Sequence, residues 1–135
     1  MIAANLDDLE WKPKNTLPPG ADSANVYGIP AEGNYAFYAR FPQGYTVPMH
    51  WHTNDVWVVI VKGSMLIRRD DIPDQTIGRG GFFFLPGGMR YIAQCNEECI
   101  FLAYGFKPFD IFYKNPKDDP RNEAKSSLAF KRARE

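Results

Sequence analysis

Short apolar segments separated by glycine and proline constrain the fold of this chain more than any other feature of its sequence. These segments cover residues 35–41, 55–61, 64–69, 82–85, 89–94 and 100–106. Strands of this length and spacing are typical of an all-β sandwich or barrel. Residues 55–61 are apolar at nearly every position, which predicts a strand that is covered on both faces.

We expect the chain to form one domain, with a segment before and a segment after these strands. At 135 residues the chain is long enough for one substantial core. Residues 1–33 are polar and rich in turns, and we expect them to pack on the barrel as an N-terminal arm. We expect residues 34–113 to form the antiparallel barrel. Residues 114–135 are dominated by charge and are expected to form a C-terminal tail, in which residues 122–135 make at most a short helix.

Composition and charge exclude several classes of protein. Lysine and arginine together number 16, as do aspartate and glutamate, so the formal net charge is zero. The excess of basic residues that neutralises phosphates is absent, and we expect no nucleic-acid partner. The N-terminal residues lack the basic and apolar regions of a signal peptide, and no apolar run approaches the roughly 18 residues of a membrane-spanning helix. We therefore expect a cytoplasmic protein that does not bind membranes.

The two cysteines of the chain, Cys95 and Cys99, flank a three-residue segment, Asn96-Glu97-Glu98. This segment has the length of a hairpin loop, which would place the two sulfurs on facing strands. A disulfide is then geometrically possible. Because a cytoplasmic compartment is reducing, two reduced and partly buried thiols are the favoured interpretation.

The two histidines of the chain, His50 and His52, stand one residue apart. On an extended strand, residues i and i+2 point to the same side, so both imidazoles would converge on one volume, as ligands of one metal ion must. A second interpretation is that both are neutral imidazoles hydrogen-bonded inside a barrel. The pair marks the candidate site in either case.

The order and spacing of these landmarks resemble the cupin superfamily. Its first motif runs Gly-x5-His-x-His-x3-Glu-x6-Gly, and its second runs Gly-x5-Pro-x-Gly-x2-His-x3-Asn. The positions that this chain matches are Gly44, His50, His52, Gly63, Gly80, Pro86 and Gly88. Residues 107–111 and 115–121 look like the terminal segment of small bacterial cupins, so the resemblance covers about residues 35–121. It implies an antiparallel jelly-roll barrel with its site in the mouth.

The chain departs from the family at two of its four metal-ligand positions. Val56 stands at the glutamate position and Tyr91 at the second-motif histidine position. Asp55 is adjacent to Val56, but on a regular strand that continues from His50 its side chain points outward; a bulge near residues 53–54 would reverse this. Tyr91 is expected to point inward. It is either a phenolate ligand, for which an ion must supply roughly 4 kcal/mol, or a neutral hydroxyl that closes the pocket.

Three functions are compatible with this site. In the first, His50, His52 and Tyr91 hold a weakly bound iron, manganese, zinc or nickel ion in an oxygenase or isomerase. In the second, a metal-free isomerase, lyase or cyclase uses a histidine as general base and Tyr91 as acid. In the third, the protein only binds a small molecule, as a sensor or as a subunit that stabilises a complex.

Two further expectations concern the pocket and the assembly. Val56, Val58 and Ile60 share the inward face of their strand and are expected to form an apolar pocket floor for a small-molecule ligand. Barrels of this type leave edge strands that must be covered, and the aromatic arm before residue 41 is suited to cover the edge of a neighbouring copy. We therefore expect a homodimer.

Overall fold

The structure is a computed structural model of the chain and describes residues 1–122. Strands and 3-10 helices (η) are, in chain order, η1 (Leu6–Asp8), β1 (Lys12–Pro13), β2 (Asp22–Gly28), β3 (Tyr35–Phe41), β4 (Thr46–Trp51), β5 (Val56–Lys62), β6 (Ser64–Arg68), β7 (Gln75–Gly78), β8 (Phe82–Leu85), β9 (Tyr91–Cys95), β10 (Cys99–Gly105), β11 (Phe112–Tyr113) and η2 (Pro116–Asp118). None of the helices within residues 1–122 has the length and apolar character that crossing a membrane requires.

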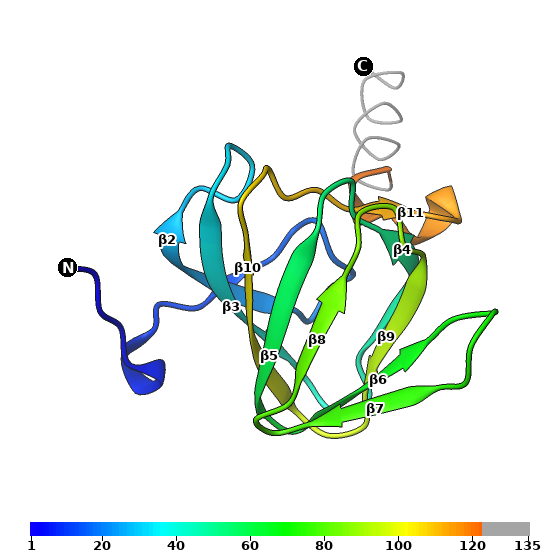
Figure 1. Ribbon diagram of the computed structural model, residues 1–135, viewed down its shortest axis with the longest axis horizontal. Helices are drawn as coiled ribbons and strands as arrows, with labels where there is room; N and C mark the ends of the chain where they lie inside the picture. The colour runs from blue at the N-terminus through cyan, green and yellow to red at the C-terminus, as the bar shows by residue number, and fades with distance from the viewer. Residues whose placement is uncertain (123–135) are drawn as a thin grey trace, which may run out of the picture.

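Two antiparallel sheets pack face to face, as Figure 1 shows. One has six strands in the order β1-β2-β3-β10-β5-β8, and the other has five in the order β11-β4-β9-β6-β7. Non-consecutive strands lie side by side in both sheets, which is the arrangement of a jelly roll. The all-β jelly-roll prediction is confirmed.

The core lies between the two sheets and follows the two-residue period of the strands. Along β3 and β5 every second side chain is buried, and Val56, Val58 and Ile60 are each at most 3% exposed. The intervening residues of β5 are half-buried on the outer face of the sheet. Because β5 lies between β10 and β8, it needs apolar residues on both faces, as its sequence predicts.

The expected N-terminal arm, residues 1–33, contains a strand of the barrel. β2 pairs with β3 from Asp22↔Arg40 to Gly28↔Tyr35, and β1 in turn pairs with β2. The six-stranded sheet therefore begins well before residue 34, at Lys12. Of the short helix expected over residues 122–135, residues 123–135 lie outside the described part of the chain.

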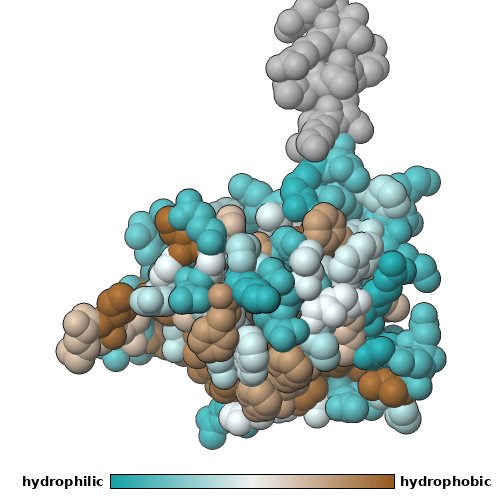
Figure 2. All heavy atoms as spheres, turned by 45° about the horizontal axis from the view of Figure 1, so that its top comes forward, coloured by the Kyte–Doolittle hydropathy of each residue, from teal (hydrophilic) through white to brown (hydrophobic). Residues whose placement is uncertain are grey.

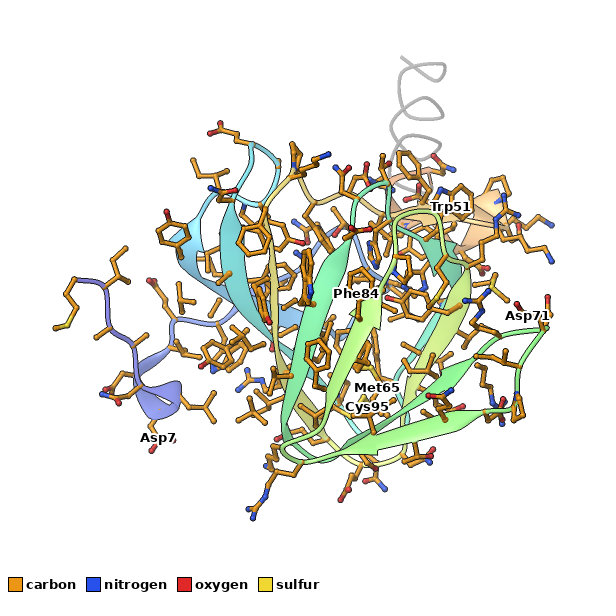
Figure 3. All side chains as sticks on the ribbon, viewed as in Figure 1. Asp7, Trp51, Met65, Asp71, Phe84 and Cys95 are labelled. Carbon is orange, nitrogen blue, oxygen red and sulfur yellow. A yellow bond between two sulfur atoms is a disulfide. The ribbon has the colours of Figure 1, made fainter. Side chains whose placement is uncertain are left out.

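Cys95 and Cys99 form a disulfide, which corrects the expectation of two reduced thiols. The segment between them is not a hairpin loop, because β9 belongs to the five-stranded sheet and β10 to the six-stranded sheet. The chain crosses between the sheets here and brings the two Cα atoms to 6.0 Å, within the range of a disulfide. The bond joins the two sheets at one end of the molecule, and Trp51 marks the other end (Figure 3).

Aromatic side chains gather on the outer side of the six-stranded sheet. Trp57 on β5 is opposite Phe84 on β8 and Tyr104 on β10, with ring centroids 5.1 and 6.0 Å away. Phe106 packs edge-on against Trp57 at 5.2 Å, and Phe82 precedes Phe84 on the same face of β8. We call these five residues the outer aromatic face; Figure 2 shows hydrophobic side chains gathered toward the bottom of its view. Phe82, Phe84 and Phe106 are 55%, 41% and 64% exposed.

Candidate functional site

A narrow cavity between the two sheets brings the expected site residues together. Its volume is about 50 Å³, several times the roughly 10–15 Å³ that one water needs. Most of its wall is apolar, including Val56 and Val58, which the sequence predicts as pocket residues. Ile60 is not part of this wall, because it is buried deeper in the core at 1% exposure. The nitrogen and oxygen side-chain atoms of the wall come from Lys14, His50, His52 and Tyr91.

An irregularity in β4 turns His50 into the cavity. The pairing of β4 with β9 shifts register between Val47 and His50, and both of these residues are buried although three positions apart. The two residues between them take up the extra length. The ring Nδ1 of His50 then lies 2.7 Å from the carbonyl oxygen of Pro48. His50 is opposite Tyr91 of β9, with ring centroids 4.2 Å apart.

His52 follows the end of β4 and is held by its own backbone and by the segment before β11. Its carbonyl oxygen accepts a hydrogen bond from the amide of Gly88 at 2.7 Å. The next amide, that of Thr53, donates to the carboxylate of Asp110 at 2.7 Å. The carbonyl oxygen of Asp110 lies 2.6 Å from the Nδ1 atom of His52. Asp110 therefore fixes both the ring of His52 and the backbone that follows it.

Asp55 lies outside the cavity. The chain turns over residues 53–55 rather than continuing as a strand, and Asp55 is exposed at this turn. Its carboxylate accepts a hydrogen bond from the amide of Gly87 at 2.8 Å. The expectation that Asp55 points outward is confirmed, although a turn and not strand parity is the cause.

The hydrogen bonds fix the protons on the two imidazoles. A carbonyl oxygen only accepts, so Nδ1 donates in both rings and Nε2 carries the lone pair. The Tyr91 hydroxyl lies 3.0 Å from Nε2 of His52 and donates to it. Within residues 1–122 the hydrogen bond of the His50 ring is the one from Nδ1 to Pro48, and none is made through Nε2. The cavity therefore contains one imidazole lone pair that no protein group uses.

Burial keeps these groups uncharged at neutral pH. It lowers the pKa of His50 from 6.5 to about 3, with a further contribution from neighbouring His52. Burial also lowers the pKa of His52, although the hydrogen bond to Asp110 opposes this. Burial raises the pKa of the Tyr91 hydroxyl, and neighbouring Tyr113 and Tyr35 add to the effect. Of the two interpretations of Tyr91, this environment favours the neutral hydroxyl over the phenolate.

Comparison with known proteins identifies the architecture through solved structures. No family model matches the chain, and neither does any curated protein. The polyketide cyclase RemF from Streptomyces resistomycificus superposes with a TM-score of 0.75 at 16% identity, over 93% of each chain. An RmlC-like cupin protein from Ralstonia eutropha JMP134 gives 0.66 at 19% identity, over 96% of this chain and 85% of that one. A sugar phosphate isomerase from a cupin superfamily, from Silicibacter pomeroyi, gives 0.65 at 17% identity, over 84% and 82%. This chain has the cupin fold.

The cupin fold implies a metal ion, so we asked whether the side-chain donors in the cavity could hold one. Val56 contributes no donor, and the cavity wall has neither a carboxylate nor a thiolate. No group of three histidine, cysteine, aspartate or glutamate side chains within the described residues is arranged to hold an ion. The lone pair of His52 already accepts the Tyr91 proton, and the Lys14 ammonium would repel a cation. These residues do not fit the three or four protein ligands usual for a tightly held ion.

Lys14 is the site residue that sequence reasoning misses. It follows β1 within the expected arm, yet its side chain lines the cupin pocket. Its Nζ atom lies over the ring of Phe37, 4.4 Å from the centroid, and 5.2 Å from that of Phe109. Burial lowers the pKa of Lys14 from 10.5 to about 8. Nothing in the local sequence around Lys14 distinguishes it from a solvated lysine.

Proposed function

We propose that this cupin is an enzyme that moves a proton on a small, mainly apolar organic molecule without a metal ion. One observation carries the proposal: the ring of His50, whose Nε2 lone pair no protein group in the described residues uses, lines a largely apolar cavity. Burial keeps this imidazole unprotonated at neutral pH, which is the form in which a general base acts.

Tyr91 and His52 complete the chemistry that this proposal requires. The Tyr91 ring packs against that of His50, so a substrate beside one also contacts the other. The hydroxyl is the acid that the proposal requires, and the 3.0 Å hydrogen bond to His52 holds it in place until a substrate oxygen replaces His52 as the acceptor of its proton. His50 takes a proton from one substrate atom, while the Tyr91 hydroxyl turns its one proton from Nε2 of His52 to the substrate oxygen on which negative charge develops. Return of the proton to another carbon gives an isomer. Attack of the deprotonated carbon on a second carbonyl carbon of the same molecule, with the proton returned to that carbonyl oxygen, closes a ring.

The comparisons support an enzymatic function over one of binding alone. The polyketide cyclase and the sugar phosphate isomerase are named for rearrangements of small organic molecules. At 16% and 17% identity they support only the class of chemistry, and substrate identity rests on the residues of this pocket.

Proton exchange in deuterated water tests the proposal directly. A panel of small ketones, aldehydes and carboxylic acids is incubated with the protein, and deuterium at carbon is followed by NMR. We expect the wild-type protein to label at least one compound beside its carbonyl group, and the His50→Gln variant to label it no faster than buffer. Equal labelling by both proteins, or by neither, contradicts the proposal.

Metal titration separates this function from a metal-assisted one. An ion present at a hundred times its dissociation constant stabilises the folded state by about 2.7 kcal/mol, which is readily seen as a rise in melting temperature. We expect iron, manganese, zinc and nickel to give no rise that depends on His50, because the donor set is incomplete. A rise in wild type that is lost in His50→Ala would favour the metal-assisted oxygenase or isomerase instead.

We further propose that two copies pair through the outer aromatic face. Phe82, Phe84 and Phe106 leave much of their surface in water, and contiguous exposed aromatic surface is typical of an interface. We expect Phe84→Ser to shift a dimer toward monomer in sedimentation equilibrium at micromolar concentration. Phe112→Ser is the matched control, since Phe112 is similarly exposed at 44% but lies on β11 of the other sheet. A monomeric wild type, or an equal effect of both variants, contradicts the pairing.

A further inference from the structure

Lys14 is a charged group in the pocket with no counter-ion in the described residues. None of the ion pairs or side-chain hydrogen bonds within residues 1–122 involves its Nζ atom. The other polar groups of the wall, His50, His52 and Tyr91, are neutral. The cavity therefore combines one cationic group with an otherwise apolar lining.

The backbone of Lys14 is fastened, so its side chain enters the pocket from a fixed point. The amide of Lys14 donates to the carbonyl oxygen of Ala21 at 2.9 Å, and its own carbonyl oxygen accepts from the amide of Leu17 at 3.1 Å. Two tyrosine hydroxyls hold the same loop: Tyr45 donates to the Pro18 carbonyl oxygen at 2.5 Å, and Tyr113 to that of Thr16 at 2.6 Å. Lys14 is thus positioned by both sheets rather than hanging from a loose arm.

The rings beneath Lys14 satisfy only part of its bonding capacity. The faces of Phe37 and Phe109 attract the ammonium, and these two rings pack edge to face with centroids 5.3 Å apart. Aromatic faces accept no conventional hydrogen bonds, whereas an ammonium has three donors. A cation that is partly desolvated without an acceptor is costly unless a ligand supplies one.

We propose that the pocket binds an organic carboxylate, with the carboxylate group paired to Lys14 and the apolar part of the molecule between the aromatic rings and the His50–Tyr91 pair. This inference rests on the proposed function and names its substrate class. Phe109 contacts both ends of such a ligand site, because its ring lies 4.9 Å from that of His52 and also beneath Lys14. Lys14 would bind the carboxylate, and His50 would contact the uncharged part of the molecule.

Calorimetric titration with matched acids and amides tests the inference. The probes are butyrate and benzoate, with butyramide and benzamide as neutral counterparts of nearly the same shape. We expect the wild-type protein to bind at least one carboxylate about tenfold or more tightly than its amide, the preference that a charge-assisted hydrogen bond supplies. Equal affinities for acid and amide, or no binding of either, would overturn the inference and leave Lys14 as a side chain that merely covers the cavity.

Two lysine variants make the comparison specific. Lys14→Met keeps an unbranched apolar side chain and is expected to lose the preference for the acid, with amide affinity changed less than about threefold. Lys12→Met is the matched control, because Lys12 lies two residues earlier on β1 and is exposed. It is expected to bind like wild type. The same loss in both variants would assign the effect to overall charge and overturn the inference.

The outcome is independent of whether His50 is a base. The titration measures binding alone and requires no proton transfer. Carboxylate binding that depends on Lys14 without any proton exchange would refute the proposed function and keep this inference. Proton exchange on uncharged compounds, with no binding preference for acids, would refute this inference and keep the proposed function.

Discussion

Replacing His50 with glutamine is expected to slow proton exchange by about a hundredfold to ten-thousandfold, the usual contribution of a general base. Glutamine is polar and close in size to histidine, so it leaves no large cavity, but its amide has no basic lone pair. The rate constant at saturating substrate should fall while ligand affinity stays within about threefold. NMR measurement of deuterium incorporation at several substrate concentrations separates the two quantities.

A pair of tyrosine variants provides the control for this result. Tyr91→Phe removes the hydroxyl that His52 orients and should also slow exchange. Tyr113→Phe removes a hydroxyl from a ring whose centroid lies 6.2 Å from that of His50, but this hydroxyl is bound to Thr16 outside the proposed chemistry. Because this bond holds the loop of Lys14, Tyr113→Phe is expected to weaken substrate binding but to keep the wild-type exchange rate at saturating substrate. Exchange lost in Tyr113→Phe as fully as in Tyr91→Phe would indicate a general packing effect and count against the assigned roles.

The second large effect is expected in the pH dependence of stability. The pKa of His50 is about 3 in the folded protein and 6.5 in the unfolded chain, so between these values the unfolded chain binds the proton and the folded protein does not. The contribution of neutral His50 to the free energy of unfolding is therefore fully present above about pH 6.5. It is lost as the pH falls toward 3, at about 1.4 kcal/mol per pH unit. The lowered pKa of His52 adds a loss in the same direction.

Chemical denaturation between about pH 7 and pH 4 measures this slope. We compare the free energy of unfolding of wild type with that of His50→Gln, since carboxylates and other groups contribute equally to both and cancel in the difference. The variant should be less dependent on pH by about 1.4 kcal/mol per unit below pH 6.5. Parallel curves for the two proteins would show that His50 is not held neutral in the folded state.

The sequence was sufficient for the strands and for most of the candidate site because both follow from local patterns. The apolar segments between glycine and proline predicted the strands, and the two-residue period predicted the inward direction of Val56 and Val58. The same reasoning placed His50, His52 and Tyr91 together, as the structure does. These predictions depend on strand geometry and on motif spacing, which are encoded over a few residues.

The remaining features depend on contacts between residues far apart in the chain. Lys14 reaches the pocket only because Ala21, Tyr45 and Tyr113 fasten its loop, and no local pattern encodes these bonds. The disulfide follows from a crossing between sheets that the three-residue spacing made look like a hairpin. β2 was missed because its sequence is more polar than that of the other strands and its pairing with β3 is not visible in the local pattern.

The irregularity in β4 and the loop after β1 belong to separate parts of the fold, and this separation has a consequence for how the protein changes in evolution. The imidazoles and the phenol stand on paired core strands, where substitutions disturb packing. The loop that ends β1 lies beside a two-residue strand at the edge of its sheet, where insertions and replacements are far better tolerated. Under the proposed function, substitutions in this loop would change which charged molecules the pocket accepts without altering His50, His52 or Tyr91.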